Sequence, residues 1–240
     1  MTASAYDGKL FSLALGGKLG SGVVQRGART YDGIQASPVI FLGFFDERVQ
    51  LVGTSLEFQD FIVADIVRGR SKLSFISDDP FLKTAGAVDI RSSRPTTLEW
   101  MTRLELFLPS FATPWVQFDL AYARELKEHR GSYFELTGRA TLARLFPEKG
   151  KARFEPQLFV TLGFGDTGHN DFWYGAGAGS GFTHVEYGIA VVAPARIDRH
   201  FPVFRFYRYD LLRTSAVGPG QLVAQTGGFQ ADAIFAFGIF

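Results

Sequence analysis

Cysteine is absent from this chain of 240 residues. The absence excludes a disulfide framework, a thiolate metal site and a catalytic cysteine. A charge excess of either sign is missing too, because 25 Lys and Arg residues oppose 24 Asp and Glu residues. The net charge of +1 creates no global field that would attract a polyanion, so we expect no nucleic-acid partner.

Long apolar runs are also lacking. A transmembrane helix needs roughly 18 consecutive apolar residues, and the run at 189–195 is far shorter. Any membrane-spanning segment is therefore expected to be a β-strand. Residues 1–9 have neither the basic nor the apolar region of a secretory signal, so we expect export through a signal peptide that this sequence does not contain.

The chain does show a period of two, which is typical of β-strands. In residues 98–108, one face carries Leu98, Trp100, Thr102, Leu104, Leu106 and Leu108, and the other carries Glu99, Met101, Arg103, Glu105 and Phe107. A helix would put Glu99 and Arg103 on the same side as the leucines. The same alternation of an oily and a polar face returns in three further segments, at 116–125, 133–142 and 153–164.

A soluble β-sandwich or lipocalin-like barrel also alternates, but its polar face would lie outside. Three features favour a membrane barrel: the oily face of 98–108 carries no charge, aromatic residues concentrate toward strand ends, and the last residue is Phe240. Tight connections also alternate with longer, polar or glycine-rich ones, as in bacterial outer-membrane barrels. The tight connections are 110–114, 147–151 and 195–199, and the longer ones are 125–131, 165–183 and 213–228.

These patterns predict an all-β fold, a transmembrane antiparallel up-and-down β-barrel that occupies residues 1–240 as a single domain in the outer membrane of a Gram-negative cell. We count about 12 strands, with ten as the alternative. The N-terminal strands are the hardest to delimit. We place them at 10–24, 38–46, 49–56, 58–67 and 71–76, followed by an outer loop through Pro95.

The polar faces predict a lumen charge network, which consists of Glu99, Arg103, Glu105, Asp119, Glu135, Arg139, Arg153 and Glu155. A tight hairpin at 110–114 pairs Arg103 with Asp119, whereas a slip of two residues puts Glu105 there instead. Arg139 is expected opposite or diagonal to Asp119. Such a network either lines a selective pore or satisfies buried charges, and the near-balance of charge favours the second role and a small conductance.

Histidine offers the one plausible catalytic centre. His169 and His184 lie in or beside the long connection 165–183, near acidic residues that could orient a general base for a hydrolase. No nucleophile is singled out, because Ser180 and Thr183 lack an elbow motif. The glycine-rich segment 175–181 lacks the Lys-Ser/Thr of a phosphate-binding loop. We therefore predict no enzyme, no catalytic residue, no metal site and no cofactor.

The aromatic C-terminal strand, with Phe235, Phe237 and Phe240, is predicted to be an assembly signal. Resemblance to outer-membrane barrels implies that the barrel-insertion machinery recognises it, with membrane lipid as the other partner. The phase of this strand stays open. Either Phe240 and Ile234 face outward together with Asp232, or Phe229, Phe235, Phe237 and Ile239 do.

The order of features resembles the MipA/OmpV family of outer-membrane proteins. A glycine-rich first strand at 15–20 is followed by Tyr31-Asp32-Gly33 and a proline-led strand at Pro38; later, 162–166 leads into Phe172-Trp173-Tyr174-Gly175. The chain departs from the family at Ala176-Gly177, where a β-branched residue and Ser are expected. The resemblance implies a non-enzymatic barrel, which in some members is a scaffold that links peptidoglycan-remodelling enzymes to the outer membrane, and in others an adhesin or stress-related protein.

Overall fold

A computed structural model describes residues 11–45, 48–64, 66–76, 82–83, 96–108, 115–142, 155–192, 203–212 and 227–238. The strands are β1 (Phe11–Gln25), β2 (Ala28–Phe44), β3 (Val49–Val52), β4 (Ser55–Val63), β5 (Val67–Ile76), β6 (Leu82–Lys83), β7 (Thr97–Leu108), β8 (Trp115–Glu125), β9 (Ser132–Thr141), β10 (Glu155–Gly165), β11 (Gly181–Val192), β12 (Val203–Leu211) and β13 (Gly227–Gly238). One α-helix, α1 (Thr167–Tyr174), occurs among these residues. No described helix combines the length and the apolar character needed to cross a membrane.

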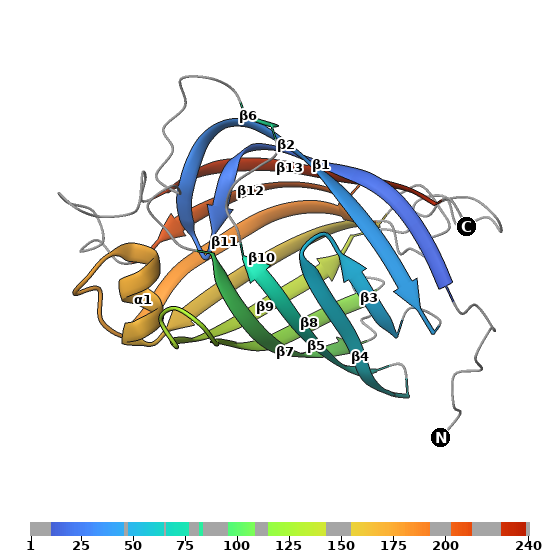
Figure 1. The fold of residues 1–240 in the computed structure, drawn as a ribbon, viewed down its shortest axis with the longest axis horizontal. Coiled ribbons are helices and arrows are strands. Elements are labelled where there is room, and N and C mark those ends of the chain that lie inside the picture. The colour runs from blue at the N-terminus through green and yellow to red at the C-terminus, as the bar shows by residue number, and fades with distance from the viewer. Residues whose placement is uncertain are drawn as a thin grey trace.

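Twelve of these strands form a closed antiparallel barrel (Figure 1). Each strand pairs with its neighbour in the chain, and β1 pairs with both β2 and β13, which closes the ring. The remaining strand, β6, pairs through two residues with the edge of β2. The predicted fold class and the count of twelve strands are therefore confirmed.

The N-terminal strands differ from their predicted bounds. β2 begins at Ala28 rather than at 38, and it runs directly out of the turn after β1. The turn predicted between the strands at 49–56 and 58–67 lies instead at Gly53 and Thr54, between β3 and β4. β4 ends at Val63 rather than at 67, and β5 begins at Val67 rather than at 71. Gly53 has a φ of 58°, a backbone conformation that glycine adopts at little cost. The alternation could not locate this turn, because apolar residues continue on both sides of it.

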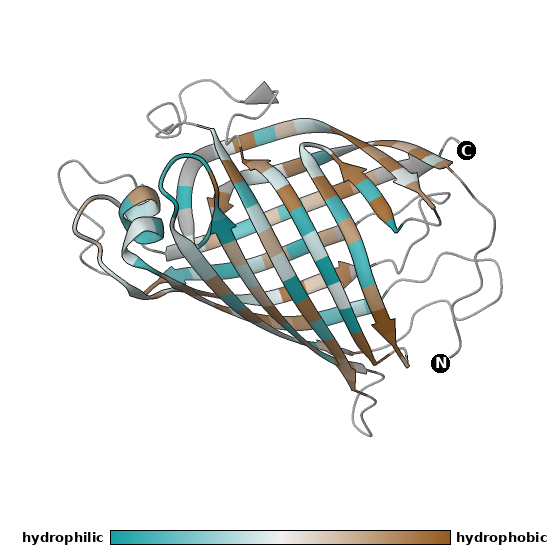
Figure 2. Cartoon of the chain, turned by 60° about the horizontal axis from the view of Figure 1, so that its bottom comes forward, coloured by the Kyte–Doolittle hydropathy of each residue, from teal (hydrophilic) through white to brown (hydrophobic). Residues whose placement is uncertain are grey.

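The alternation itself is present as expected. Leu104, Leu120 and Leu136 face outward on adjacent strands, and they are aligned in register. Glu105 and Asp119 point inward between them and are buried. Figure 2 shows the resulting bands of apolar and polar residues across the strands. The exterior therefore presents a broad apolar surface, and the lumen holds the polar side chains.

The C-terminal strand adopts the oilier of its two possible phases. Phe229 is 56% exposed on the outside, whereas Asp232 is 5% exposed and points inward. The Phe235 ring lies over Gly17 of β1, where a Cβ would approach it to 2.9 Å. Phe237 lies in β13, but its side chain is not described, and Phe240 lies outside the described residues. The assembly role of this strand stays a prediction.

The two ends of the barrel differ. β1 begins and β13 ends at one end, which we call the terminal end, and α1 lies at the other, the α1 end (Figure 1). The connection 125–131 and α1, within the connection 165–183, lie at the α1 end. The predicted tight connections 110–114, 147–151 and 195–199 fall outside the described residues, as does most of 213–228.

Candidate functional site

The register of β7 and β8 decides which lumen charges meet. Glu105 lies directly opposite Asp119, and Arg103 lies opposite Ala121. The predicted pair of Arg103 with Asp119 is therefore wrong, and the register slipped by two residues is the one adopted. The residue pattern could not separate the two, because a slip of two keeps every side chain on the same face.

Three ion pairs connect members of the lumen charge network to one another or to a neighbouring strand. The expected contact of Arg139 with Asp119 is present, with 2.7 Å between Nη1 and Oδ2. Arg103 approaches Glu135 at 3.7 Å. Arg70 of β5 approaches Glu105 at 3.5 Å. Because the carboxylates are largely buried and the arginines are partly exposed, these contacts keep charge neutralised on the barrel wall.

Other members lie elsewhere or were missed. Arg153 lies outside the described residues, and Glu155 is buried at the start of β10. Arg205 of β12 donates to Asp232 of β13 at 2.6 Å, a pair that the sequence reasoning overlooked. Its signal was present, because Arg205 alternates with Phe204 and Phe206 as the other lumen charges do with their apolar neighbours.

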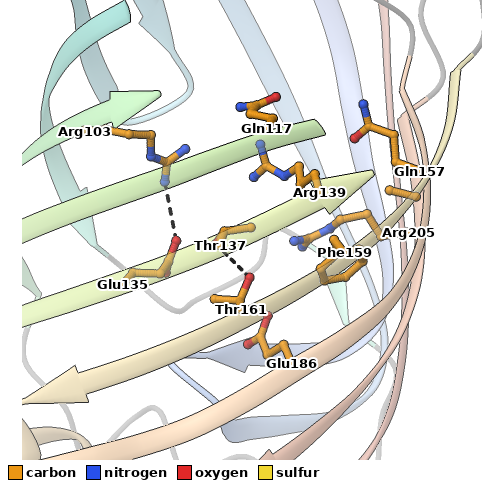
Figure 3. A pocket seen from close by; sticks show the side chains of 11 residues that line it. Arg103, Gln117, Glu135, Thr137, Arg139, Gln157, Phe159, Thr161, Glu186 and Arg205 are labelled. Carbon is orange, nitrogen blue, oxygen red and sulfur yellow. Dashed lines mark hydrogen bonds and ion pairs between the residues drawn. The ribbon is translucent and has the colours of Figure 1, made fainter. Parts of the chain in front are cut away.

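A cavity of about 420 Å³ lies inside the barrel (Figure 3). Its lining residues come from β7 through β12, and they are Arg103, Gln117, Glu135, Thr137, Arg139, Gln157, Phe159, Thr161, Glu186, Ala190 and Arg205. The lining thus contains three of the eight predicted lumen charges, Arg103 on β7 and Glu135 and Arg139 on β9. It adds Glu186 from β11 and Arg205 from β12.

The tip of the β1–β2 hairpin lies against side chains of other strands at the α1 end. Arg26 donates to both carboxylate oxygens of Glu99, at 2.5 and 2.7 Å, and its guanidinium lies 3.7 Å from the centre of the Tyr133 ring. Tyr174 of α1 donates a hydrogen bond to the backbone oxygen of Arg26. Arg26 and Gly27 both have positive φ, as the tight turns of β-hairpins often require.

Helix α1 is held against the same tip. Asp166 caps its first turn by accepting from the backbone N–H of His169, and its other oxygen accepts from the N–H of Ser132 on β9. Asn170 donates to the backbone oxygens of Gly165 and Gly179. We call the hairpin tip at 26–27, the loop at 126–131 and α1 together the cap. The sequence reasoning assigned the helical part of the cap to an irregular loop.

The loop of the cap is organised by one carboxylate. Glu125 accepts hydrogen bonds from four successive backbone N–H groups, at 2.8 to 2.9 Å, which belong to Lys127, Glu128, His129 and Arg130. The Glu125 carboxylate therefore holds the backbone of the loop at 126–131 in its observed conformation.

We expect the variant Glu125→Ala to loosen this loop without unfolding the barrel. Hydrogen bonds to a charged acceptor each contribute about 1.5–3 kcal/mol, so the amides of 127–130 should exchange with deuterium roughly tenfold faster or more. Hydrogen–deuterium exchange with mass spectrometry measures this directly. Glu128→Ala is the matched control, because the Glu128 side chain pairs with the exposed side chain of Lys127 and its removal should leave exchange unchanged. Equal exchange in both variants would contradict the role given to Glu125.

Among the described residues, His129 and His169 are packed in the cap and His184 is buried beside it on β11; none of these three lines the cavity. His169 is 1% exposed, stacks on Tyr133 at 4.9 Å and lies 5.8 Å from the His129 ring. Its Nε2 has no hydrogen-bond partner among the described residues. His184 contacts the Thr183 hydroxyl at 2.9 Å and Glu186 at 3.7 Å, and both His184 and Thr183 are buried. Both histidines of the pair that suggested a hydrolase are therefore buried, at 1% exposure each.

The surroundings of the cap histidines disfavour their charged forms. Burial, followed by the charges of Arg26, His129 and His184, lowers the pKa of His169 well below its usual value. Burial likewise lowers the pKa of His129. The N-terminal turn of α1, where His169 lies, adds to the penalty on a positive charge.

The cap is therefore expected to loosen in acid. An opened cap binds protons at a pKa of about 6.5, above the lowered pKa of the packed His169. Stability of the cap is thus fully present above about pH 6.5 and is lost as the pH falls toward the lowered pKa. Hydrogen exchange of α1 at successive pH values, corrected for the intrinsic rate, measures this. In His169→Phe, which keeps a ring over Tyr133, the acid-induced rise should shrink; an undiminished rise would assign it to other groups.

No family model matches this chain, and a search of curated proteins gives no match either.

Proposed function

We propose that this chain is an integral protein of a Gram-negative outer membrane and acts there as a capped scaffold barrel rather than as an open channel. The observation that carries the proposal is the combination of an apolar exterior with an ion-paired and capped interior. Water in contact with so much exposed Leu and Phe would be unfavourable, whereas lipid would not. We further propose membership of the MipA/OmpV family, on the resemblance described above.

The terminal end offers a surface for a protein partner. β4 continues past the end of β3 and pairs there with β5 alone. Phe61, Ile62 and Val63 are exposed on this extension, on both faces of the strand, and Ile66 is exposed just before β5 begins. An apolar projection beyond the edge of a barrel suits contact with a periplasmic or membrane-bound protein. Under the proposal, the terminal end faces the periplasm.

Two experiments test the two halves of this proposal. The purified full chain should remain folded and monodisperse only with detergent or lipid, and a folded monomer in plain buffer would overturn the membrane assignment. Co-purification from outer membranes in mild detergent should retain a stoichiometric protein, and Ile62→Ser/Val63→Ser should release it. Leu126→Ser, an apolar-to-polar change at the α1 end, is the matched control. Absence of any retained protein would overturn the scaffold role.

A narrow channel is the second candidate function, and the cavity of about 420 Å³ is the observation that favours it. A channel of this kind requires the cap to open, since Arg26 and Tyr174 join the hairpin tip to α1. Planar-bilayer recordings separate the two functions. Stable unitary currents from the unmodified chain near pH 7 would favour the channel over the capped scaffold.

A further inference from the structure

The cavity has side chains suited to bind a ligand, beyond any role in a scaffold. Its volume of about 420 Å³ is within the range of small-molecule sites, roughly 300–1,000 Å³. Such sites combine an apolar wall with a few oriented polar groups. In this cavity Phe159 and Ala190 are the apolar lining residues, and the other nine are polar or charged.

Two arginines provide oriented cationic groups. Arg139 and Arg205 are each held by one buried carboxylate, from Asp119 at 2.7 Å and Asp232 at 2.6 Å. The arginine side chains are 31% and 40% exposed, and Figure 3 shows both reaching into the same space. A guanidinium has five N–H donors, so each pair leaves further donors for another acceptor. The carboxylates therefore fix the direction of the arginines and do not exhaust their hydrogen bonds.

The lining residues close to Arg139 and Arg205 are neutral, and one of them, Phe159, is aromatic. Phe159 lies on β10 and packs against Tyr207 of β12, with 6.0 Å between the ring centres. Gln157 also lines the cavity, and its amide donates to the Thr141 hydroxyl at 3.3 Å. An organic body can rest on the Phe159 ring while its polar atoms meet the guanidinium groups.

The acidic members of the lining lie toward the cap. On β9, Glu135 is nearer the α1 end than Arg139, and on β11, Glu186 is nearer that end than Ala190. Arg205 is opposite Ala190, so it too lies away from the cap. The cavity is therefore more basic on the side of the terminal end. An anion is expected at that side, with hydroxyl or other donor groups directed toward Glu186.

We propose that the cavity binds a small polar organic anion, with its carboxylate or phosphate between Arg139 and Arg205 and its body against Phe159. Arginine suits this role because its planar fork of donors matches the oxygens of either group.

Calorimetric titration of the detergent-purified full chain tests the site with two matched pairs of probes. Galacturonate is compared with galactose, and glucose 6-phosphate with glucose, so that each pair differs in its anionic group. We expect one or both anions to bind at least about tenfold more tightly than the neutral sugar, the ratio identifying carboxylate or phosphate as the preferred group. Equal affinities within both pairs, or no binding of either anion at millimolar concentration, would overturn the proposal.

Arginine variants locate the binding. Arg139→Gln and Arg205→Gln should each weaken binding of the preferred anion at least about tenfold. Arg208→Gln is the matched control, because Arg208 lies on the outer face of β12, paired with Asp210. Since Arg139→Gln leaves Asp119 buried without its cation, the double variant Asp119→Asn/Arg139→Gln keeps the wall neutral and should show the same loss. Unchanged affinity in folded variants would place the anion elsewhere and overturn the site.

Discussion

Arg26→Ala is expected to turn a weakly conducting barrel into one with stable unitary currents. The substitution removes the paired hydrogen bonds to Glu99 and the contact with the Tyr133 ring. It also leaves the buried Glu99 carboxylate without its cation. Breaking a buried pair in this way costs about 3–5 kcal/mol, which favours the open cap by roughly two to four powers of ten. Single-channel recording in planar bilayers near pH 7 measures the change.

Two control variants test whether a rise in current on Arg26→Ala comes from opening of the cap. Arg208→Ala removes an exposed arginine that pairs with Asp210 on the outer face, and it should leave the current unchanged. The double variant Arg26→Ala/Glu99→Ala removes both charges and should conduct less often than Arg26→Ala alone, because no carboxylate is left unpaired. If the unmodified chain conducts as well as Arg26→Ala, the cap does not block the lumen.

Leu120→Arg is expected to destabilise the barrel strongly in a lipid bilayer. Leu120 is 53% exposed on the outer face of β8, in register with Leu104 and Leu136 on either side. An arginine that faces lipid near the bilayer centre costs about 2–4 kcal/mol. Denaturant-induced unfolding in liposomes measures the free energy of unfolding, and intact-cell fractionation measures how much chain reaches the outer membrane.

The position of the charge provides the control. Leu126 is 49% exposed, similar to Leu120, but it follows the end of β8 at the α1 end. Leu126→Arg should therefore cost only about 0–1 kcal/mol, as charges do near the membrane surface. Leu120→Phe, which keeps an apolar side chain, should be nearly neutral. Equal costs at the two positions would mean that lipid does not surround this face.

Side-chain alternation made the barrel wall predictable. In β7, β8 and β9 the alternation of charged and leucine residues is sufficient to assign Glu105 and Asp119 to the lumen and Leu104 and Leu120 to the exterior. The same rule extends to Arg205, which alternates with phenylalanines. The predicted count of twelve is compatible with antiparallel closure of the barrel. With an even number of strands, the first and the last strand run in opposite directions and can pair.

The alternation of polar and apolar residues could not predict the cap or the exact neighbours of each lumen charge. Arg26 lies in a turn, where no period applies, and its partners Glu99 and Tyr133 are far away in the sequence. Helix α1 has eight residues, too few for a helical period to be distinct. Register between strands was undetermined for a different reason, since a two-residue slip preserves both faces.

The pairing of β1 with β13 constrains the order in which this molecule can fold. These strands come from opposite ends of the described chain, so their contacts have the highest sequence separation in the sheet. Until β13 is in place, the nascent sheet has two open edges with unsatisfied N–H and C=O groups, which invite pairing with other chains. Such late closure of distant strands makes folding slow. The seam between β1 and β13 is thus the step at which an assembly catalyst would have its greatest effect on rate.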